Sequence, residues 1–336
     1  EEDTMKKVLA LVLVGILLLT CVACSGDAEQ ASNAPGTNNG DTPNVDTKEA
    51  KNIAIIPWDM GEQFATDVVA SVQNECDKRG WDLQVLDPVG DWNKVVEYLE
   101  NLIVQRPDGI IYTAIDCAAA GDMVQKVVDA GIPIIGYDCL ADAGNETGAV
   151  RCNDYMGGTL AAQAMMEALG GKEDATIVIY EEDPSVASSW RRNNGFTDYL
   201  EENYPNVTYI KRRTMDLNRD TLRAWAVDMV TTYPETDGIF AYVGDCGVAS
   251  WHGLQEMGAT DVIVITYDGT EEQIQLMKDG GADCSMYAVV TMYPEFFGTS
   301  CIEMMEKVFN GNYTRQGPDD IFEFEPDIIY AKDLAK

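Results

Sequence analysis

The sequence predicts an α/β protein of two similar lobes, each built on a parallel sheet with helices on both faces. From residue 51 onward, short apolar runs alternate with longer stretches whose apolar residues recur at helical spacing. This alternation is typical of βαβ units, in which the sheet is parallel and covered on both sides. The alternation starts again near Thr176, and 336 residues suffice for about two domains of the usual ~100–200 residues.

In the first lobe, four apolar runs are predicted to form strands, over residues 53–56, 83–86, 109–112 and 133–136. The stretches between them are predicted to form helices, over residues 64–79, 92–105 and 118–130. The second lobe repeats the strands at residues 176–180, 207–210, 238–241 and 262–266. Details repeat as well, because Asp-Gly-Ile followed by Tyr-Asp occurs once in each half, at nearly equal spacing. Two matching lobes explain this repetition better than one long sheet.

The first fifty residues indicate export and a tether. Lys6 and Lys7 precede an apolar run over residues 8–19, which at roughly 12 residues is shorter than the ~20 that span a bilayer and fits a secretory signal. The run ends in CVACSG, with Ala23 before Cys24, which resembles a bacterial lipoprotein box. We therefore expect a signal peptide over residues 1–23, a lipid anchor on Cys24 and a disordered tether over residues 24–50. Ordinary secretion is the alternative, and both place the chain outside the cytoplasm.

Composition excludes several classes of function. A formal net charge of −34 disfavours nucleic-acid binding. His252 is the sole histidine, so sites that need several are excluded, and no G-x-G-x-x-G or P-loop motif follows a predicted strand. We expect no metal and no cofactor. Seven cysteines remain after Cys21 and Cys24, an odd number without a short C-x-x-C pair. This disfavours a disulfide framework, although a bond between Cys139 and Cys152 is left open.

Two aspartates mark a predicted cleft. Asp138 and Asp268 follow equivalent strands of the two halves. Ligands of open parallel sheets bind beyond the carboxyl ends of the strands, so both side chains are expected to face a cleft between the lobes. The alternative is that each aspartate only caps a following helix or turn.

Several segments together resemble a family. They are AGIPIIGYD at residues 130–138, CNDYMGG at 152–158, NGF at 194–196 and ITYDGT at 265–270. In this order and spacing they are similar to the type I periplasmic solute-binding proteins of bacterial sugar transporters, the ribose- and galactose-binding kind. The resemblance covers residues 52 to about 312.

The resemblance implies a hinge of three chain segments, with crossings near residues 152–154, 288–291 and 322–326. The lobes would then comprise residues 51–153 plus 289–324, and residues 154–288 plus 325–336. Closure about such a hinge traps one small molecule between the lobes.

The resemblance also implies a set of ligand-binding residues. Besides Asp138 and Asp268, they are Trp58, Glu62, Phe64, Thr113, Trp190, Arg191, Arg192, Asp245 and Thr291. Glu62 could instead be an exposed acid at a helix start, and Phe64 and Trp190 could be core residues. Gapless matching places Trp190 where the family has a cleft arginine, and a small shift would place Arg191 or Arg192 there. Which of these two enters the cleft is left open, and the other could be a solvated surface residue.

The expected function is capture without catalysis. We expect an extracytoplasmic, lipid-anchored substrate-binding protein of an ABC transporter, monomeric, which delivers a small polar ligand to a membrane permease. A monosaccharide is the expected ligand. A sensor that presents its closed form to a membrane receptor is the alternative. If neither Arg191 nor Arg192 enters the cleft, an amine-bearing ligand becomes the alternative, because the remaining groups are acidic and aromatic.

Overall fold

A computed structural model describes residues 50–214 and 217–335 of the chain, and these residues form two α/β lobes. Each lobe holds a six-stranded sheet, with strand orders β11-β5-β4-β3-β1-β2 and β12-β10-β9-β8-β6-β7. The orders correspond position by position, which confirms the predicted fold class of two similar lobes. The predicted signal peptide, the anchor Cys24 and nearly all of the tether lie outside the described residues.

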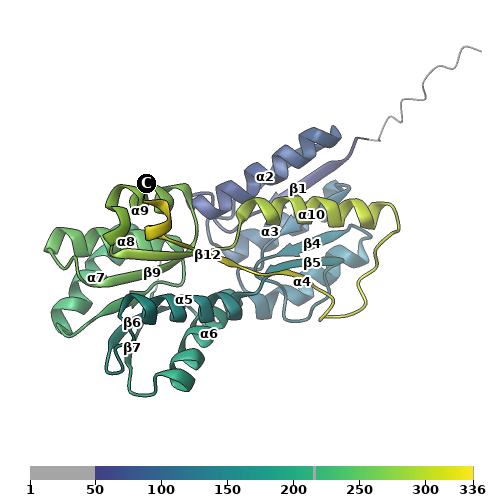
Figure 1. Ribbon diagram of the computed structural model, residues 1–336. Helices are drawn as coiled ribbons and strands as arrows, with labels where there is room; N and C mark the ends of the chain where they lie inside the picture. The colour runs from purple at the N-terminus through teal and green to yellow at the C-terminus, as the bar shows by residue number, and fades with distance from the viewer. Residues whose placement is uncertain (1–49, 215–216, 336) are drawn as a thin grey trace, which may run out of the picture. The chain divides into compact units, whose positions relative to one another are not determined.

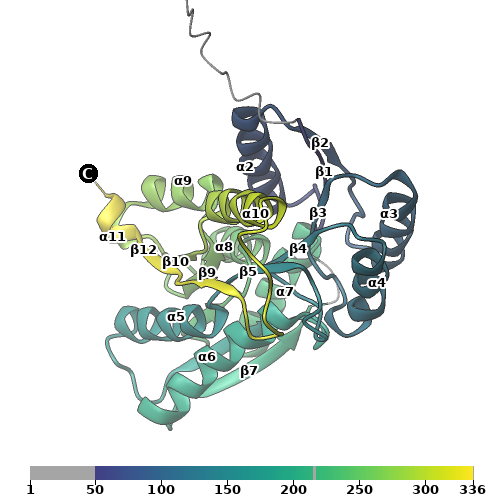
Figure 2. The same ribbon diagram turned by 90° about the vertical axis from the view of Figure 1, so that its right-hand side faces the viewer.

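The N-terminal lobe lies at the right of Figure 1. Its strands are β1 (Asn52–Ile56), β2 (Asp82–Val85), β3 (Gly109–Tyr112), β4 (Ile134–Tyr137), β5 (Gly148–Cys152) and β11 (Phe322–Phe324), and all of its strand pairs are parallel. Its helices are α2 (Gln63–Arg79), α3 (Trp92–Gln105), α4 (Cys117–Asp129) and α10 (Pro294–Phe309). Figures 1 and 2 show α2 and α10 side by side on one face of the sheet, while α3 and α4 cover the other.

The C-terminal lobe has strands β6 (Thr176–Glu181), β7 (Thr208–Arg213), β8 (Gly238–Phe240), β9 (Ile263–Asp268), β10 (Met286–Thr291) and β12 (Asp327–Tyr330). Its helices are α5 (Asp154–Ala168), α6 (Ala187–Asn203), α7 (Arg219–Thr232), α8 (Gly244–Met257), α9 (Glu271–Gly280), a short 3-10 helix (Gly281–Asp283) and α11 (Ala331–Leu334). Its strand pairs are parallel, except that β12 runs antiparallel to β10. No helix in the described part of the chain is long and apolar enough to cross a bilayer.

Local sequence explains where these elements begin and end. The central strands β3 and β4 are fully buried apolar runs, as strands covered on both faces must be. The side chains of Asp91 and Asp116 accept backbone N–H groups at the starts of α3 and α4. Helix α2 ends at Gly80, whose φ of 68° is left-handed and suits glycine best.

The chain crosses between the lobes three times. The first crossing is at Asn153, between β5 and α5, and the third is at residues 325–326, between β11 and β12. The Asn153 N–H donates to the Phe324 carbonyl at 2.9 Å, so these two crossings are joined. The second crossing comes after Thr291, because β10 stays paired with β9 through that residue. Residues 289–291 therefore belong to the C-terminal lobe, which corrects the lobe boundary placed before residue 289.

Candidate functional site

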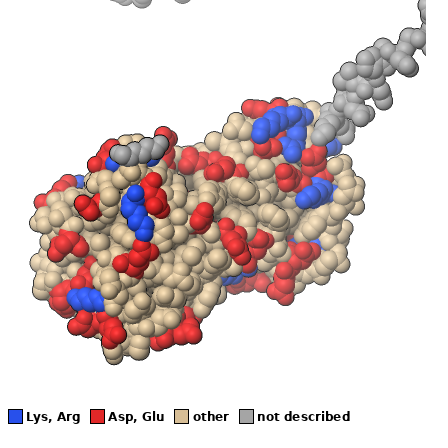
Figure 3. Space-filling model, in the orientation of Figure 1, with Lys and Arg blue, Asp and Glu red and all other residues tan. Residues whose placement is uncertain are grey.

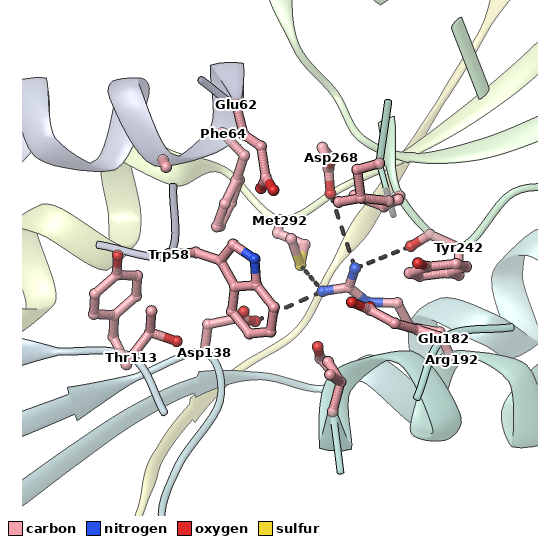
Figure 4. A pocket seen from close by; sticks show the side chains of 16 residues that line it. Trp58, Glu62, Phe64, Thr113, Asp138, Glu182, Arg192, Tyr242, Asp268 and Met292 are labelled. Carbon is pink, nitrogen blue, oxygen red and sulfur yellow. Dashed lines mark hydrogen bonds and ion pairs between the residues drawn. The ribbon is translucent and has the colours of Figure 1, made fainter. Parts of the chain in front are cut away.

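Side chains of both lobes line one cavity at the carboxyl ends of the two sheets (Figure 4). It encloses about 550 Å³ of empty space, part of which is continuous with solvent. The structure places around it these residues that the sequence had singled out: Trp58, Glu62, Phe64, Thr113, Asp138, Arg192 and Asp268. They come from the loops and helix starts that follow β1, β3 and β4, from the last residue of β9, and from α6. The rule that ligands bind beyond strand ends thus located the cavity.

Arg192 lies at the centre of the charged groups. It is buried on α6, and its Nε donates to Asp154 Oδ1 at 2.8 Å. Its Nη2 lies 3.6 Å from Asp138 Oδ1, and its Nη1 lies 3.9 Å from Asp268 Oδ1. One guanidinium therefore faces an acid of the N-terminal lobe, the first residue of α5 and an acid of the C-terminal lobe. This answers which arginine enters the cavity.

Other contacts fix the plane of the guanidinium. Its Nη1 donates to the Tyr242 carbonyl at 3.0 Å, and its Nη2 lies 2.9 Å from the Met292 sulfur. The Arg192 Cζ atom lies 4.2 Å from the centre of the Tyr267 ring. With donors engaged in several directions, the side chain is held in place before any ligand arrives.

The two strand-end aspartates share a backbone feature. Asp138 has a φ of 58° and Asp268 a φ of 87°, both in the left-handed region that residues other than glycine rarely adopt. Strained conformations of this kind cluster at functional sites. Their surroundings differ, because Asp268 Oδ2 accepts the Gly244 N–H at 2.7 Å, whereas Asp138 Oδ1 is buried without a hydrogen-bond partner. Asp268 therefore caps the start of α8 as well as facing the cavity.

The carboxyl groups of the cavity hold their protons more tightly than exposed acids do. Burial, followed by repulsion from Asp245, Asp268 and other acids, raises the pKa of Glu62 to about 9. Burial raises the pKa of Asp138 to about 7 against the opposing effect of Arg192, and that of Glu182 also to about 7. Asp268 reaches a pKa of about 6, again through burial, with Arg192 opposing. Carboxyls crowded in a poorly solvated cavity avoid being ionised together.

Aromatic rings form the apolar part of the wall. Trp58 and Phe64 line the cavity from the N-terminal lobe, and Tyr242 lines it from the C-terminal lobe. Phe64 is supported from behind by Phe297 of α10, in an edge-to-face contact with ring centres 5.7 Å apart. Figure 4 shows the Trp58 and Phe64 rings on one side of the cavity, with the Glu62 carboxyl between Phe64 and Asp268. Glu62 is the N-cap residue of α2, and its side chain makes no capping hydrogen bond but lines the cavity.

Four of the proposed site residues lie outside this cavity. Trp190 is 44% exposed and stacks with Arg191, whose Cζ lies 5.2 Å from the indole centre. Both precede Arg192 on α6, and the rotation of about 100° per residue in a helix directs them elsewhere. Asp245 pairs with Arg219 at 2.5 Å and lines an adjoining smaller cavity. Thr291 accepts the Tyr293 N–H and lines a separate groove.

Sequence reasoning missed several groups around the cavity. Glu182 follows β6 and Tyr242 follows β8, so the strand-end rule applied to every strand would have found them. Asp154 starts α5 directly after the first crossing, yet no local pattern marks it as the partner of Arg192. Met292 reaches the cavity from the second crossing.

Among the described residues, no group of three or more His, Cys, Asp or Glu is arranged to hold a metal ion. Cys139 and Cys152 are both buried free thiols.

Comparison with known proteins gives consistent results. The sequence model of the periplasmic binding protein domain matches residues 53–312. The ribose import binding protein RbsB of Salmonella typhimurium is 24% identical, over 77% of this chain and 85% of that protein. RbsB of Bacillus subtilis is 23% identical, over 91% of this chain and 94% of that protein.

Solved structures share the fold. A periplasmic solute-binding protein of an ABC transporter from Actinobacillus succinogenes, solved with bound D-allose, superposes with a TM-score of 0.76 and 23% identity, over 84% of this chain and 99% of that one. A carbohydrate transporter solute-binding protein from Agrobacterium radiobacter, solved with D-arabinose, gives a TM-score of 0.76 and 22% identity, over 84% and 94%. With two matching lobes, three crossings and this domain match, the chain belongs to the periplasmic binding proteins and has their type I fold.

Proposed function

We propose that this protein captures a sugar or related polyol outside the cytoplasm and delivers it to the permease of an ABC importer. One observation carries the proposal: a single cavity receives carboxylates from both lobes, at Asp138 and Asp268, around one buried arginine. Carboxylates and arginine form charge-assisted hydrogen bonds with hydroxyl groups, and aromatic faces cover the apolar side of a sugar ring. The curated relatives named for ribose import, and the neighbours solved with D-allose and D-arabinose, support a sugar ligand.

The proposed cycle needs binding and closure but no chemistry. A ligand that touches both lobes favours the closed arrangement, because it binds that arrangement better than the open one. The permease then recognises the closed form. The protein acts as a monomer tethered to the membrane through a lipid on Cys24, which places the cavity near the permease.

Ligand screening tests this function. D-Ribose, D-allose, D-arabinose and related sugars and polyols are titrated into the protein, with thermal unfolding and solution scattering as readouts. A true ligand stabilises the fold by about 2.7 kcal/mol at a hundredfold excess over Kd, and it reduces the radius of gyration. A ligand that binds tightly without changing the scattering curve contradicts capture by closure.

The lipid anchor has its own test. Cys24→Ser is expected to release the protein from membranes, because acyl chains supply the hydrophobic attachment. Cys21→Ser is the matched control and should stay attached. Membrane association of Cys24→Ser that survives a carbonate wash contradicts the anchor.

A further inference from the structure

We propose that the ligand carries a protonated amine in addition to its hydroxyl groups, as an amino sugar does, and that Glu62 and Glu182 bind this amine. The inference rests on the proposed function and narrows its ligand class. It follows from the charges that the cavity leaves unpaired.

The cavity contains more acid than its arginine can neutralise. Among the described residues, four carboxyl groups line it, those of Glu62, Asp138, Glu182 and Asp268, and Arg192 is the one basic residue in that part of the wall. The guanidinium is also already engaged, since its shortest ionic contact, at 2.8 Å, is with Asp154, which does not line the cavity. The Asp138 and Asp268 carboxylates lie farther from the guanidinium, at 3.6 and 3.9 Å, and share its remaining charge. Entry of Arg192 therefore does not make the site electrically balanced.

Glu62 and Glu182 are left without a cation. Neither has a basic group within 4.0 Å among the residues that the structure describes. Tyr242 is the hydrogen-bonding neighbour of Glu182, and its phenol is neutral. Desolvation of a carboxylate without a cation in contact is costly, and it raises the pKa of Glu62 to about 9 and that of Glu182, against the longer-range effect of Arg192, to about 7.

A ligand ammonium resolves this imbalance and a neutral hydroxyl group does not. The two glutamates belong to opposite lobes, Glu62 at the start of α2 and Glu182 directly after β6. Both line the same cavity, so a bound ammonium there would be attracted by acids of both lobes and add a charge-dependent contribution to closure. Charge-assisted hydrogen bonds are roughly twice as strong as neutral ones. The Trp58 and Phe64 rings beside Glu62 can contribute cation–π attraction.

A second observation points to a polar ligand in the same space. Thr113 lines the cavity, is 1% exposed, and its hydroxyl has no hydrogen-bond partner in the described structure. Asp138 Oδ1 is also buried and, although Arg192 Nη2 lies 3.6 Å away, it accepts no hydrogen bond. Buried polar atoms normally have hydrogen-bond partners, so we expect hydroxyl groups of the ligand to bind to these two atoms. The cavity thus offers a cation-binding pair and separate positions for hydroxyl groups.

Matched sugar pairs test the inference. D-Glucosamine, D-galactosamine and D-mannosamine are each titrated by calorimetry at pH 7 against D-glucose, D-galactose and D-mannose. We expect at least one amino sugar to bind tenfold or more tightly than its hydroxyl parent. Glu62→Gln and Glu182→Gln should each reduce that preference to about threefold or less, and the preference is calculated within each variant so that any change in binding of the neutral parent is taken into account. Two variants guard against a folding defect in either one.

The control is Glu181→Gln, the neighbour of Glu182 that points away and pairs with Lys211 at 2.8 Å. It should keep the full preference for the amino sugar. A neutral sugar that binds as tightly as its amino counterpart, or a preference that survives both glutamine variants, overturns the inference and leaves the proposed function standing. If no neutral sugar, amino sugar or polyol binds or closes the lobes, the proposed function fails, and this inference with it.

Discussion

At the scale of single residues, three consecutive side chains of α6 have three different environments. Arg192 is buried among acids, Arg191 stacks on Trp190, and Trp190 is partly exposed. The sequence predicted that this segment contributes to the site, because it occupies the place of a ligand-binding segment in the family that the chain resembles. It could not choose among the three, because the choice depends on the rotation of α6 relative to α5, which is set by packing. Sequence likewise could not predict that the Asp245 carboxylate forms an ion pair with Arg219.

The two strand-end aspartates should respond differently to removal. Asp138→Ala is expected to weaken ligand binding about tenfold to a hundredfold, since a charge-assisted hydrogen bond contributes about 1.5–3 kcal/mol. The free energy of unfolding should fall less than in Asp268→Ala, because Asp138 accepts no hydrogen bond; the loss comes from its 3.6 Å contact with Arg192 and from placing alanine at a φ of 58°. Asp268→Ala should lose both binding and stability, because the Gly244 N–H loses its acceptor. Calorimetry and urea unfolding of both variants check this, and normal affinity in either one removes that residue from the site.

The pH dependence of stability is a second prediction at this scale. The pKa of Glu62 is raised from 4.5 to about 9 by burial and by Asp59, Glu182, Asp245 and Asp268. Between these values the folded protein keeps a proton that the unfolded chain has lost. The free energy of unfolding therefore falls as pH rises through this window.

Melting temperatures of the ligand-free protein from pH 5 to 9 measure this effect. Glu62→Gln should flatten the decline, because an amide does not titrate, and Glu181→Gln should leave it unchanged. A ligand-free protein that becomes more stable as the pH rises from 5 to 9 contradicts the buried, protonated carboxyl.

At the scale of elements, the sequence predicted the central strands and helices well and the crossings less well. The strands β1, β3, β4, β6, β8 and β9 are mostly buried, and their runs of apolar residues made them recognisable in the sequence. The short strands β11 and β12 are partly exposed and carry Glu323 and Asp327, so they lack that signal. Thr291 was assigned to the wrong side of a crossing because a strand that passes from one lobe toward another shows no change in apolar pattern.

Close packing of α5 against α6 is the element-scale feature that positions Arg192. A Cβ on Gly158 would lie 1.9 Å from the Arg192 carbonyl oxygen, and one on Gly195 would lie 2.0 Å from the Tyr155 carbonyl oxygen. Real atoms cannot approach so closely, so a methyl group at either position must push the helices apart. The two glycines thus allow the Arg192–Asp154 contact across the helix pair.

Gly158→Ala is therefore expected to cost roughly 1–3 kcal/mol or more of stability, as overpacking does, and to weaken ligand binding by displacing Arg192. Gly317→Ala is the control, because nothing lies within 4 Å of its added Cβ. Urea midpoints and ligand titrations of both variants give the comparison. An alanine at position 158 with unchanged stability and affinity would show that the helix contact does not hold the arginine.

At the scale of the whole molecule, acidity is a property of both lobes. Acidic side chains are spread over the face shown in Figure 3, while basic side chains occur there as small separate groups. The formal net charge of −34 therefore reflects the surface as well as the cavity. Such a surface repels anionic ligands and anionic lipid at long range and attracts cations. This field attracts an amine-bearing ligand toward the cavity.

A contact between the lobes offers a direct test of closure. Cys139 follows the cleft aspartate of the N-terminal lobe, and its sulfur lies 3.2 Å from the Ser188 hydroxyl oxygen, at the start of α6 in the C-terminal lobe. Both residues are buried. Replacing that oxygen with sulfur brings two thiols of opposite lobes within reach of the ~2.05 Å disulfide bond.

The Cys117 thiol is a hydrogen-bonding neighbour of Cys139 and would compete for it. Ser188→Cys, made together with Cys117→Ala, should therefore form a disulfide with Cys139 under a mild oxidant. The bond would hold the lobes closed, because it joins them beside the cavity. Ligand that is already bound should then leave at least tenfold more slowly, and reduction should restore the original rate. Ser185→Cys in the same background is the control, since Ser185 instead contacts Asp183. Mass spectrometry measures the bond and stopped-flow measures release. A disulfide that forms fully while ligand exchanges at the unmodified rate would mean that entry and exit need no opening of the lobes.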